Sequence, residues 1–254
     1  AHHVDHDRRE DLAVTGERIV GSIEGVPLSR LDLLLVLQGD RLHVVGGPWE
    51  VRPVAGAGLL ASGSSRIELR GARVIASHTD AAAARRLLAY ARLGTVAAMV
   101  GQMTAAVQAA RDYAVDRVVF GKPVAHHQAV AFSLVDMHMA VSSLRLLMLE
   151  AAARYDQGDA EAEVAEAAAQ CFAEAAQTAD FVGPFALQVH GASGFMRDYP
   201  VEKYMRELKT LSLLVGGIDA ARADGVPRAG SPVQGAFRHP FLRSAVAATT
   251  QEAA

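Results

Sequence analysis

A long stretch without proline constrains the fold of this chain most strongly. From Asp80 the sequence runs to about Asp116 with a helical pattern before Gly121-Lys122-Pro123 interrupts it. Asp80 is a residue type that caps helix N-termini. Helices of about 30 residues or more have axes near 45 Å. Such lengths, joined by short turns, predict an up-and-down helical bundle.

Three further helices complete the predicted four-helix bundle. The second continues from the proline break to about Tyr155, and its apolar positions alternate four and three residues apart. These positions are Val130, Leu134, Met137, Val141, Leu144, Met148 and Ala151. After the turn at Gln157-Gly158-Asp159, a third helix carries Cys171 on its apolar face, so Cys171 is expected in the core. A fourth helix is expected from about Val201 to Ala223.

The region before the helices has the pattern of a small sheet. Short β-branched or Leu-rich runs are separated by Gly, Pro and Ser clusters, and Arg66 to Arg70 alternates with period two. We predict an α+β fold in which an antiparallel β domain over 14–78 precedes the bundle over 79–224. Residues 225–254 are expected to form an irregular tail. Residues 1–13 are expected to be disordered or an expression remnant.

Charge and cysteine content exclude several classes of function. The net charge is −3, which does not favour nucleic acid or an anionic membrane. The single cysteine excludes an internal disulfide and fits the cytoplasm. The apolar stretch from Leu93 to Val107 is broken by Gln102, so a buried helix is expected there and no membrane span. No metal site is predicted, although the N-terminus carries the metal-capable residues His2, His3, Asp5, His6 and Asp7.

Three segments of the helical half stand out as motifs. The first runs from Arg117 through Phe120-Gly121 to Gln128, the second from Gln188 through Gly191 to Gly194-Phe195, and the third is Tyr199-Pro-Val-Glu-Lys203 followed by Arg206-Glu-Leu-Lys209. In order and spacing they resemble motifs of the acyl-CoA dehydrogenase family across about 85–223. The β-rich part also suits the middle domain of that family, although it carries no sharp motif.

The chemistry of the first two segments suits a dinucleotide. An arginine at a helix end followed by a turn places a cation and free N–H groups where a pyrophosphate binds. The resemblance implies that such residues reach across a subunit interface to the ADP half of an FAD held mainly by a neighbour. The residues to which it assigns this role are Arg117, Phe120, Gln128, Gln188, Gly191 and Gly194. Without the resemblance, a helix-terminal cation and ordinary turn glycines would explain them.

The residue that would abstract a proton is missing from both positions that the family uses. Members place a glutamate either before a Gly-Thr pair in the loop after the third motif, or one residue before an arginine in the first bundle helix. By resemblance these positions are Val215 and Ala91. General-base catalysis alone accounts for about 10²–10⁴-fold in rate. Asp219 and His190 are the alternative candidates for a base, but Asp219 is better explained as a solvated or dipole-satisfying carboxylate, and His190 lies nearer the expected adenosine end.

Three hypotheses follow from the resemblance. The first is a non-catalytic subunit of an FAD-dependent acyl-CoA dehydrogenase, acting in fatty-acid or steroid side-chain β-oxidation within a heterotetramer. Its partner would supply the glutamate and the acyl-CoA pocket. The second is a flavin monooxygenase or oxidase of the same fold acting on a non-CoA substrate. The third is a cofactor-free structural bundle. The N-terminal helical domain of the family and its Thr-Glu-Pro…Gly-Ser-Asp segment have no counterpart in this sequence.

Overall fold

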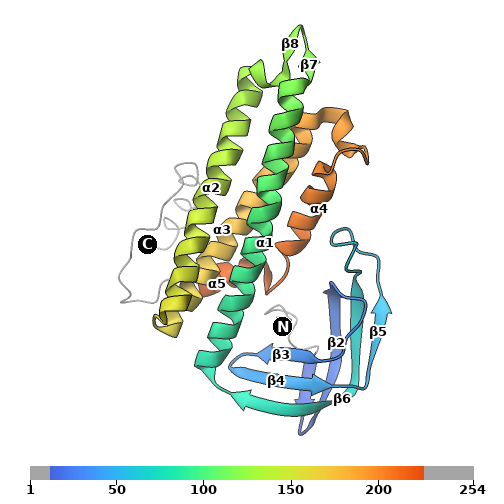
Figure 1. Cartoon of the computed structure of the whole chain (residues 1–254). Helices are drawn as coiled ribbons and strands as arrows, with labels where there is room; N and C mark the ends of the chain where they lie inside the picture. The colour runs from blue at the N-terminus through green and yellow to red at the C-terminus, as the bar shows by residue number, and fades with distance from the viewer. Residues whose placement is uncertain (1–11, 226–254) are drawn as a thin grey trace, which may run out of the picture.

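In the computed structural model, which describes residues 12–225, a β-sheet adjoins one end of a helical bundle (Figure 1). The strands of the sheet are β1 (Leu12–Thr15), β2 (Arg18–Val26), β3 (Leu34–Gln38), β4 (Arg41–Gly46), β5 (Trp49–Pro53) and β6 (Ser65–Thr79). Their order is β1-β2-β6-β4-β3, and β5 pairs with β6 off this path. All of these pairings are antiparallel, which confirms the predicted α+β fold with a small antiparallel sheet.

Strand β6 organises the sheet because its 15 residues are enough to pair with three other strands. The alternation predicted for Arg66 to Arg70 is confirmed. Ile67 and Leu69 are buried on one face, whereas Glu68 is ion-paired with Arg70 at 2.7 Å on the other.

The first strand begins inside the segment for which no structure was expected. Leu12 is 6% exposed and pairs with Gly21 of β2, so burial of a single large apolar side chain extends the sheet to this point. The metal-capable N-terminal residues and the expected irregular tail beyond residue 225 lie outside the described residues.

Within residues 12–225, five α-helices and several short elements form the second part. The helices are α1 (Ala81–Asp116), α2 (Gln128–Gln157), α3 (Glu161–His190), α4 (Val201–Leu211) and α5 (Gly217–Asp224). The short elements are the hairpin strands β7 (Val118–Val119) and β8 (Lys122–Pro123) and the 3₁₀ helices η2 (Val124–His126) and η3 (Gly191–Phe195). The hairpin lies at the end of the bundle remote from the large sheet (Figure 1).

The predicted cap of α1 is confirmed. Oδ1 of Asp80 accepts hydrogen bonds from the N–H groups of Ala82 at 2.9 Å and Ala83 at 3.1 Å. These bonds, that from Ala83 foremost, hold the pKa of the Asp80 carboxyl below its usual range. The C-terminus of α2 also has a recognisable cap. Gly158 adopts a φ of +74° and ends the helix, as glycine commonly does at this position.

The bundle core contains the residues that the helical periodicity predicts. Met137, Val141 and Leu144 of the α2 stripe are buried together with Cys171 and Phe172 of α3. Cys171 is fully buried, and burial raises the pKa of its thiol to about 12. The expected core position of Cys171 is thus confirmed.

The prediction of one continuous fourth helix was wrong. Helix α4 ends at Leu211 and α5 starts at Gly217. Between them Val215 has a φ of +49° and Gly216 a φ of +96°, and Gly217 follows with +70°. A right-handed helix cannot pass through consecutive left-handed residues, so the chain turns here.

The stretch from Leu93 to Val107, for which a buried helix was expected, lies within α1. By length and composition alone, helices α1 and α2 are long and apolar enough to cross a membrane. Core helices of soluble proteins meet the same test, and α1 and α2 each pack a stripe of buried side chains into the bundle. The two helices are therefore weak support for membrane insertion.

The sheet is fastened to the bundle at α4. Nη1 of Arg206 donates to the carbonyl oxygen of Ala57 in the loop between β5 and β6. The next glycine, Gly58, packs so tightly on α4 that a Cβ there would collide with Thr210 and the backbone of Arg206. This joint and the direct passage from β6 into α1 set the sheet against the bundle.

Candidate functional site

The first motif forms a two-residue hairpin directly after α1. Val119 pairs with Lys122, so Phe120 and Gly121 occupy the turn. Both have positive φ, +52° and +78°, which is the requirement of a type I′ turn. The backbone therefore holds the Phe120 ring out in solvent, where it is 92% exposed. An aromatic ring presented in this way suits contact with another molecule.

The second motif ends α3 and forms the next turn. Gln188 is exposed in the last turn of α3, and Gly191 ends the helix with φ +57° and ψ −139°, a region open to glycine. Gly194 is buried instead, and a Cβ there would lie 2.9 Å from Cδ1 of Leu187 and 3.0 Å from Cβ of His190. Its position is one of close packing within this turn.

Aromatic contacts hold the two motifs side by side. The ring of Tyr113, one helical turn before Arg117, stacks on His190 with centroids 4.4 Å apart. The ring of Tyr199 lies edge-on to Tyr113 at 5.4 Å. Sequence reasoning missed Tyr113 and Tyr199 as supports, although Tyr113 stands four residues before Arg117 and Tyr199 begins the third motif.

The polar groups at this end of the bundle are available to a ligand. Arg117, Gln128 and Gln188 are exposed, and within residues 12–225 their side chains make no hydrogen bond or ion pair in the structure. Helix α2 begins at Gln128 without a side-chain cap and without an acidic residue in its first turn. Arg117 supplies a cation, Gln128 and Gln188 supply amides, and α2 supplies an uncapped N-terminus; we call this set the polar wall. Such groups suit an anionic dinucleotide. This donor set fits one side of an FAD, and Gly194 contributes only through packing.

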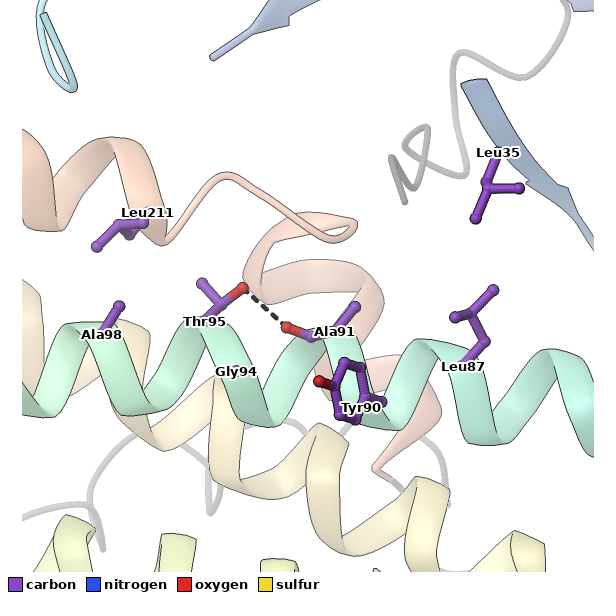
Figure 2. Close-up of a pocket in the computed structure, with 8 residues that line it drawn as sticks. All are labelled: Leu35, Leu87, Tyr90, Ala91, Gly94, Thr95, Ala98 and Leu211. Carbon is purple, nitrogen blue, oxygen red and sulfur yellow. Dashed lines mark hydrogen bonds between the residues drawn. The ribbon is translucent and has the colours of Figure 1, made fainter. Parts of the chain in front are cut away.

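A separate pocket of about 490 Å³ lies against the first half of α1. Figure 2 shows its lining side chains on α1, with Leu35 of β3 and Leu211 of α4 near them. The lining residues are Leu35, Leu87, Tyr90, Ala91, Gly94, Thr95, Ala98 and Leu211. The hydroxyl of Thr95 donates to the carbonyl oxygen of Ala91 at 2.9 Å. None of these eight residues is acidic or basic.

Both positions singled out for a base are apolar in the structure. Ala91 lines the pocket, and Val215 is 7% exposed in the bundle core. Neither alternative candidate for a base, Asp219 or His190, lines this pocket. Asp219 is exposed in the first turn of α5, where a carboxylate suits the helix dipole, and His190 is buried beside Tyr113 at the far end of the bundle.

A buried carboxylate that sequence reasoning missed lies one turn beyond the pocket. Glu207 is 8% exposed, and its Oε2 accepts a hydrogen bond of 2.8 Å from Gln102. Gln102 follows Ala98 by one turn on α1, and Glu207 precedes Leu211 by one turn on α4. Its signal in the sequence was an acidic residue on the apolar side of a helix. This pair ties α1 to α4 at the end of the pocket.

Comparisons with known proteins agree with this architecture. A family model described as the acyl-CoA dehydrogenase C-terminal domain matches residues 81–225. The probable acyl-CoA dehydrogenase FadE25 of Mycobacterium tuberculosis is 38% identical over 117 residues, which are 46% of this chain and 30% of that relative. The chain thus matches less than a third of the length of that protein.

Two solved structures extend the likeness to the sheet. Glutaryl-CoA dehydrogenase from Mycobacterium smegmatis has a TM-score of 0.74 at 23% identity over 89% of this chain and 62% of its own, and shows the fold alone. A chain of the ChsE4-ChsE5 complex from Mycobacterium tuberculosis has a TM-score of 0.71 at 27% identity, covering 84% of this chain and 60% of that one.

Proposed function

Because this chain belongs to the acyl-CoA dehydrogenase family, whose C-terminal domain fills residues 81–225, we propose that it is the non-catalytic subunit of an FAD-dependent acyl-CoA dehydrogenase made of two unlike chains. The carrying observation is the apolar character of both base positions, Ala91 on the pocket wall and Val215 in the core. A hydrocarbon side chain cannot accept the α-proton of a thioester. The partner supplies that carboxylate.

In this proposal the chain contributes the polar wall to the FAD site of the complex. Arg117, Gln128 and Gln188 are exposed. In this proposal the guanidinium of Arg117 binds the pyrophosphate, and the two amides bind ribose or phosphate oxygens. Phe120 supplies an apolar surface at the hairpin tip. FAD, when bound, accepts the hydride of the reaction. The residues of this chain hold and orient its ADP half.

The length of α1 supports a cofactor shared between chains. Arg117 stands 22 positions beyond Thr95, so the polar wall and the pocket are about 33 Å apart along the helix axis. The hairpin that follows Arg117 and the sheet-side half of α1, whose residues line the pocket, lie at different ends of the bundle (Figure 1). A structural relative described as a complex of two named components, ChsE4 and ChsE5, offers a precedent for such an assembly.

The test is flavin retention by the assembled complex. We expect the purified chain to bring little flavin absorbance and to oxidise none of a panel of acyl-CoA thioesters. Co-expression with an acyl-CoA dehydrogenase chain that carries the glutamate should yield a flavin-containing, active complex. Arg117→Ala should release FAD from that complex at unchanged subunit ratio. Arg111→Ala is the matched control, because Arg111 is also exposed but is paired with Asp112.

Two outcomes contradict the proposal. Oxidation of acyl-CoA by the chain alone would assign it its own base. Full flavin retention by the Arg117→Ala complex would instead assign this chain a purely structural role in the assembly.

A further inference from the structure

The β7–β8 hairpin that carries Phe120 is too short to hold its own shape. Each of its strands has two residues, and Pro123 in β8 has no N–H group to donate to the opposite strand. Even longer two-stranded hairpins are marginally stable at best in water when nothing packs on them. Contacts from outside the hairpin must therefore hold it.

Backbone hydrogen bonds fasten the base of the hairpin. The N–H group of Arg117 donates to the carbonyl oxygen of Tyr113 over 2.9 Å. The N–H group of Val124 donates to the carbonyl oxygen of Arg117 over 2.7 Å. Both bonds act at Arg117, three residues before Phe120, so they support the start of the hairpin and not its turn.

A side chain from the start of α2 supports the hairpin next to its turn. Nε2 of His127 lies 3.2 Å from the carbonyl oxygen of Val119, the residue directly before the turn. Because a carbonyl oxygen only accepts hydrogen bonds, Nε2 carries the proton and donates. The rings of His127 and Phe120 also lie edge to face, with centroids 6.3 Å apart and an angle of 80° between their planes.

The same side chain leaves the N-terminus of α2 open. His127 is the N-cap residue of α2, a position whose side chain often accepts a hydrogen bond from the first N–H groups of the helix. Its side chain makes no such bond here. The ring binds the hairpin instead, and the uncapped helix end stays available as part of the polar wall.

We propose that His127 is a positioning residue for the FAD site, and that it acts by holding the carbonyl group of Val119. This rests on the proposed function, in which the first motif binds the ADP half of FAD. Gln128 follows His127 directly, and Arg117 and Phe120 stand on either side of β7. One hydrogen bond thus fixes the cation and the aromatic ring of the motif relative to its amide.

Proteolysis of the purified chain measures the tether without flavin or partner. Chymotrypsin cleaves after aromatic residues, and Phe120 is 92% exposed, so a cut after Phe120, identified by fragment mass, reports opening of the hairpin. His127→Ala should be cut about fivefold faster than the unmodified chain, the effect of losing one hydrogen bond. His127→Gln should be cut at the unmodified rate, because its amide Nε2 can take the place of the ring Nε2.

His126→Ala is the matched control for both variants. His126 is the neighbouring histidine, it is exposed, and its side chain makes no hydrogen bond within residues 12–225. Its replacement should leave the rate of cutting after Phe120 unchanged.

Flavin dissociation measures the consequence in the assembled complex. The complex that contains His127→Ala should release FAD about fivefold faster than the unmodified complex at unchanged subunit ratio. His127→Gln should restore the slow release. At saturating FAD the turnover number should be the same in all three complexes, because His127 acts on how FAD is held and not on the reacting atoms.

Three results overturn the proposal. Equal cutting of His127→Ala and the unmodified chain would show that the hairpin keeps its shape without the tether. Equal cutting of His127→Gln and His127→Ala would show that the donated hydrogen bond is not what holds it. The third is unchanged FAD release from the His127→Ala complex. If Arg117→Ala still releases FAD, that result contradicts this proposal alone, and if Arg117→Ala also retains FAD, the proposed function fails with it.

Discussion

Nη2 of Arg92 lies 2.6 Å from Oδ2 of Asp224, so a residue near the start of α1 is ion-paired with the last residue of α5. The arginine side chain is 2% exposed and the aspartate side chain 35%. Nε of Arg92 has no hydrogen-bond partner within the described residues. The carboxylate is thus the main compensation for a buried cation.

Removing that carboxylate should destabilise the fold more than removing the cation. We expect Asp224→Asn to lower the free energy of unfolding by about 2 kcal/mol. Breaking a fully buried ion pair costs about 3–5 kcal/mol, and the loss here is smaller because Asp224 is partly solvated. Arg92→Met removes the charge and keeps an apolar stem, so its loss should be smaller. Urea unfolding measures both, and an equal loss would contradict this order.

Gly194 should not accept a side chain. Gly194→Ala forces a Cβ against Leu187 and His190, and we expect a loss of about 1–3 kcal/mol in unfolding free energy. Gly101→Ala is the matched control, because Gly101 lies within α1 with no atom near the added Cβ. That change should stabilise the chain by about 0.5–1 kcal/mol. In thermal unfolding, the midpoint temperature should fall for Gly194→Ala and rise for Gly101→Ala, relative to the unmodified protein.

Tyr113 should support the polar wall through its ring and not through its hydroxyl. The hydroxyl donates to Oγ of Ser193 over 3.4 Å, which is long. Tyr113→Phe should therefore be nearly neutral. Tyr113→Ala should cost about 2 kcal/mol by removing the ring from His190 and Tyr199, and should increase amide hydrogen exchange in 190–199. Equal protection of that turn in both variants would refute the role of the ring.

His43 should make the sheet sensitive to acid. It is 3% exposed, Nδ1 hydrogen-bonds with Oγ of Ser77, and Nε2 has no partner within the described residues. Burial, and then the charge of Arg41, lower the pKa of His43 below its usual range. The unfolded chain therefore binds the proton first, and stability should fall as pH drops through about 6.5 towards the lowered value.

The measurement is unfolding free energy between pH 8 and pH 5. His43→Phe should flatten the pH dependence in that window, since the replacement has no proton to bind. His138→Gln is the control, because His138 is exposed on α2, and it should leave the slope due to His43 in place. A slope that survives in His43→Phe would assign the acid sensitivity to other groups.

Local features of this fold could be predicted where the signal is local. The capping of α1 by Asp80, the end of α2 at Gly158 and the burial of Cys171 each depend on residue type and helical spacing. The order of the strands could not be predicted in this way. The central place of β6 depends on pairings with distant strands, which short-range patterns do not specify.

In the candidate site, too, local features could be predicted and contacts between distant segments could not. The three motifs identified the hairpin and the α3 turn, but not the stack of Tyr113 on His190 that joins them, because that contact crosses 77 positions of sequence. The break before α5 was missed because Thr210 to Leu214 continue an apolar helical pattern. Only Gly216-Gly217 signalled the left-handed turn. The exposed apolar side chains of α2, such as Phe132 and Leu146, were not predicted, because the buried face of the helix already explained the pattern of the segment.

Cys171 is the one thiol of the chain, and it is sealed at the centre of the bundle with its pKa raised to about 12. A maleimide or disulfide reagent can therefore reach it only when α3 parts from its neighbours. The rate at which Cys171 of the unmodified protein is labelled thus measures how often the bundle core opens. It can be measured in mixtures and at low protein concentration. Slower labelling on addition of any candidate companion would report association without a tag or a dye.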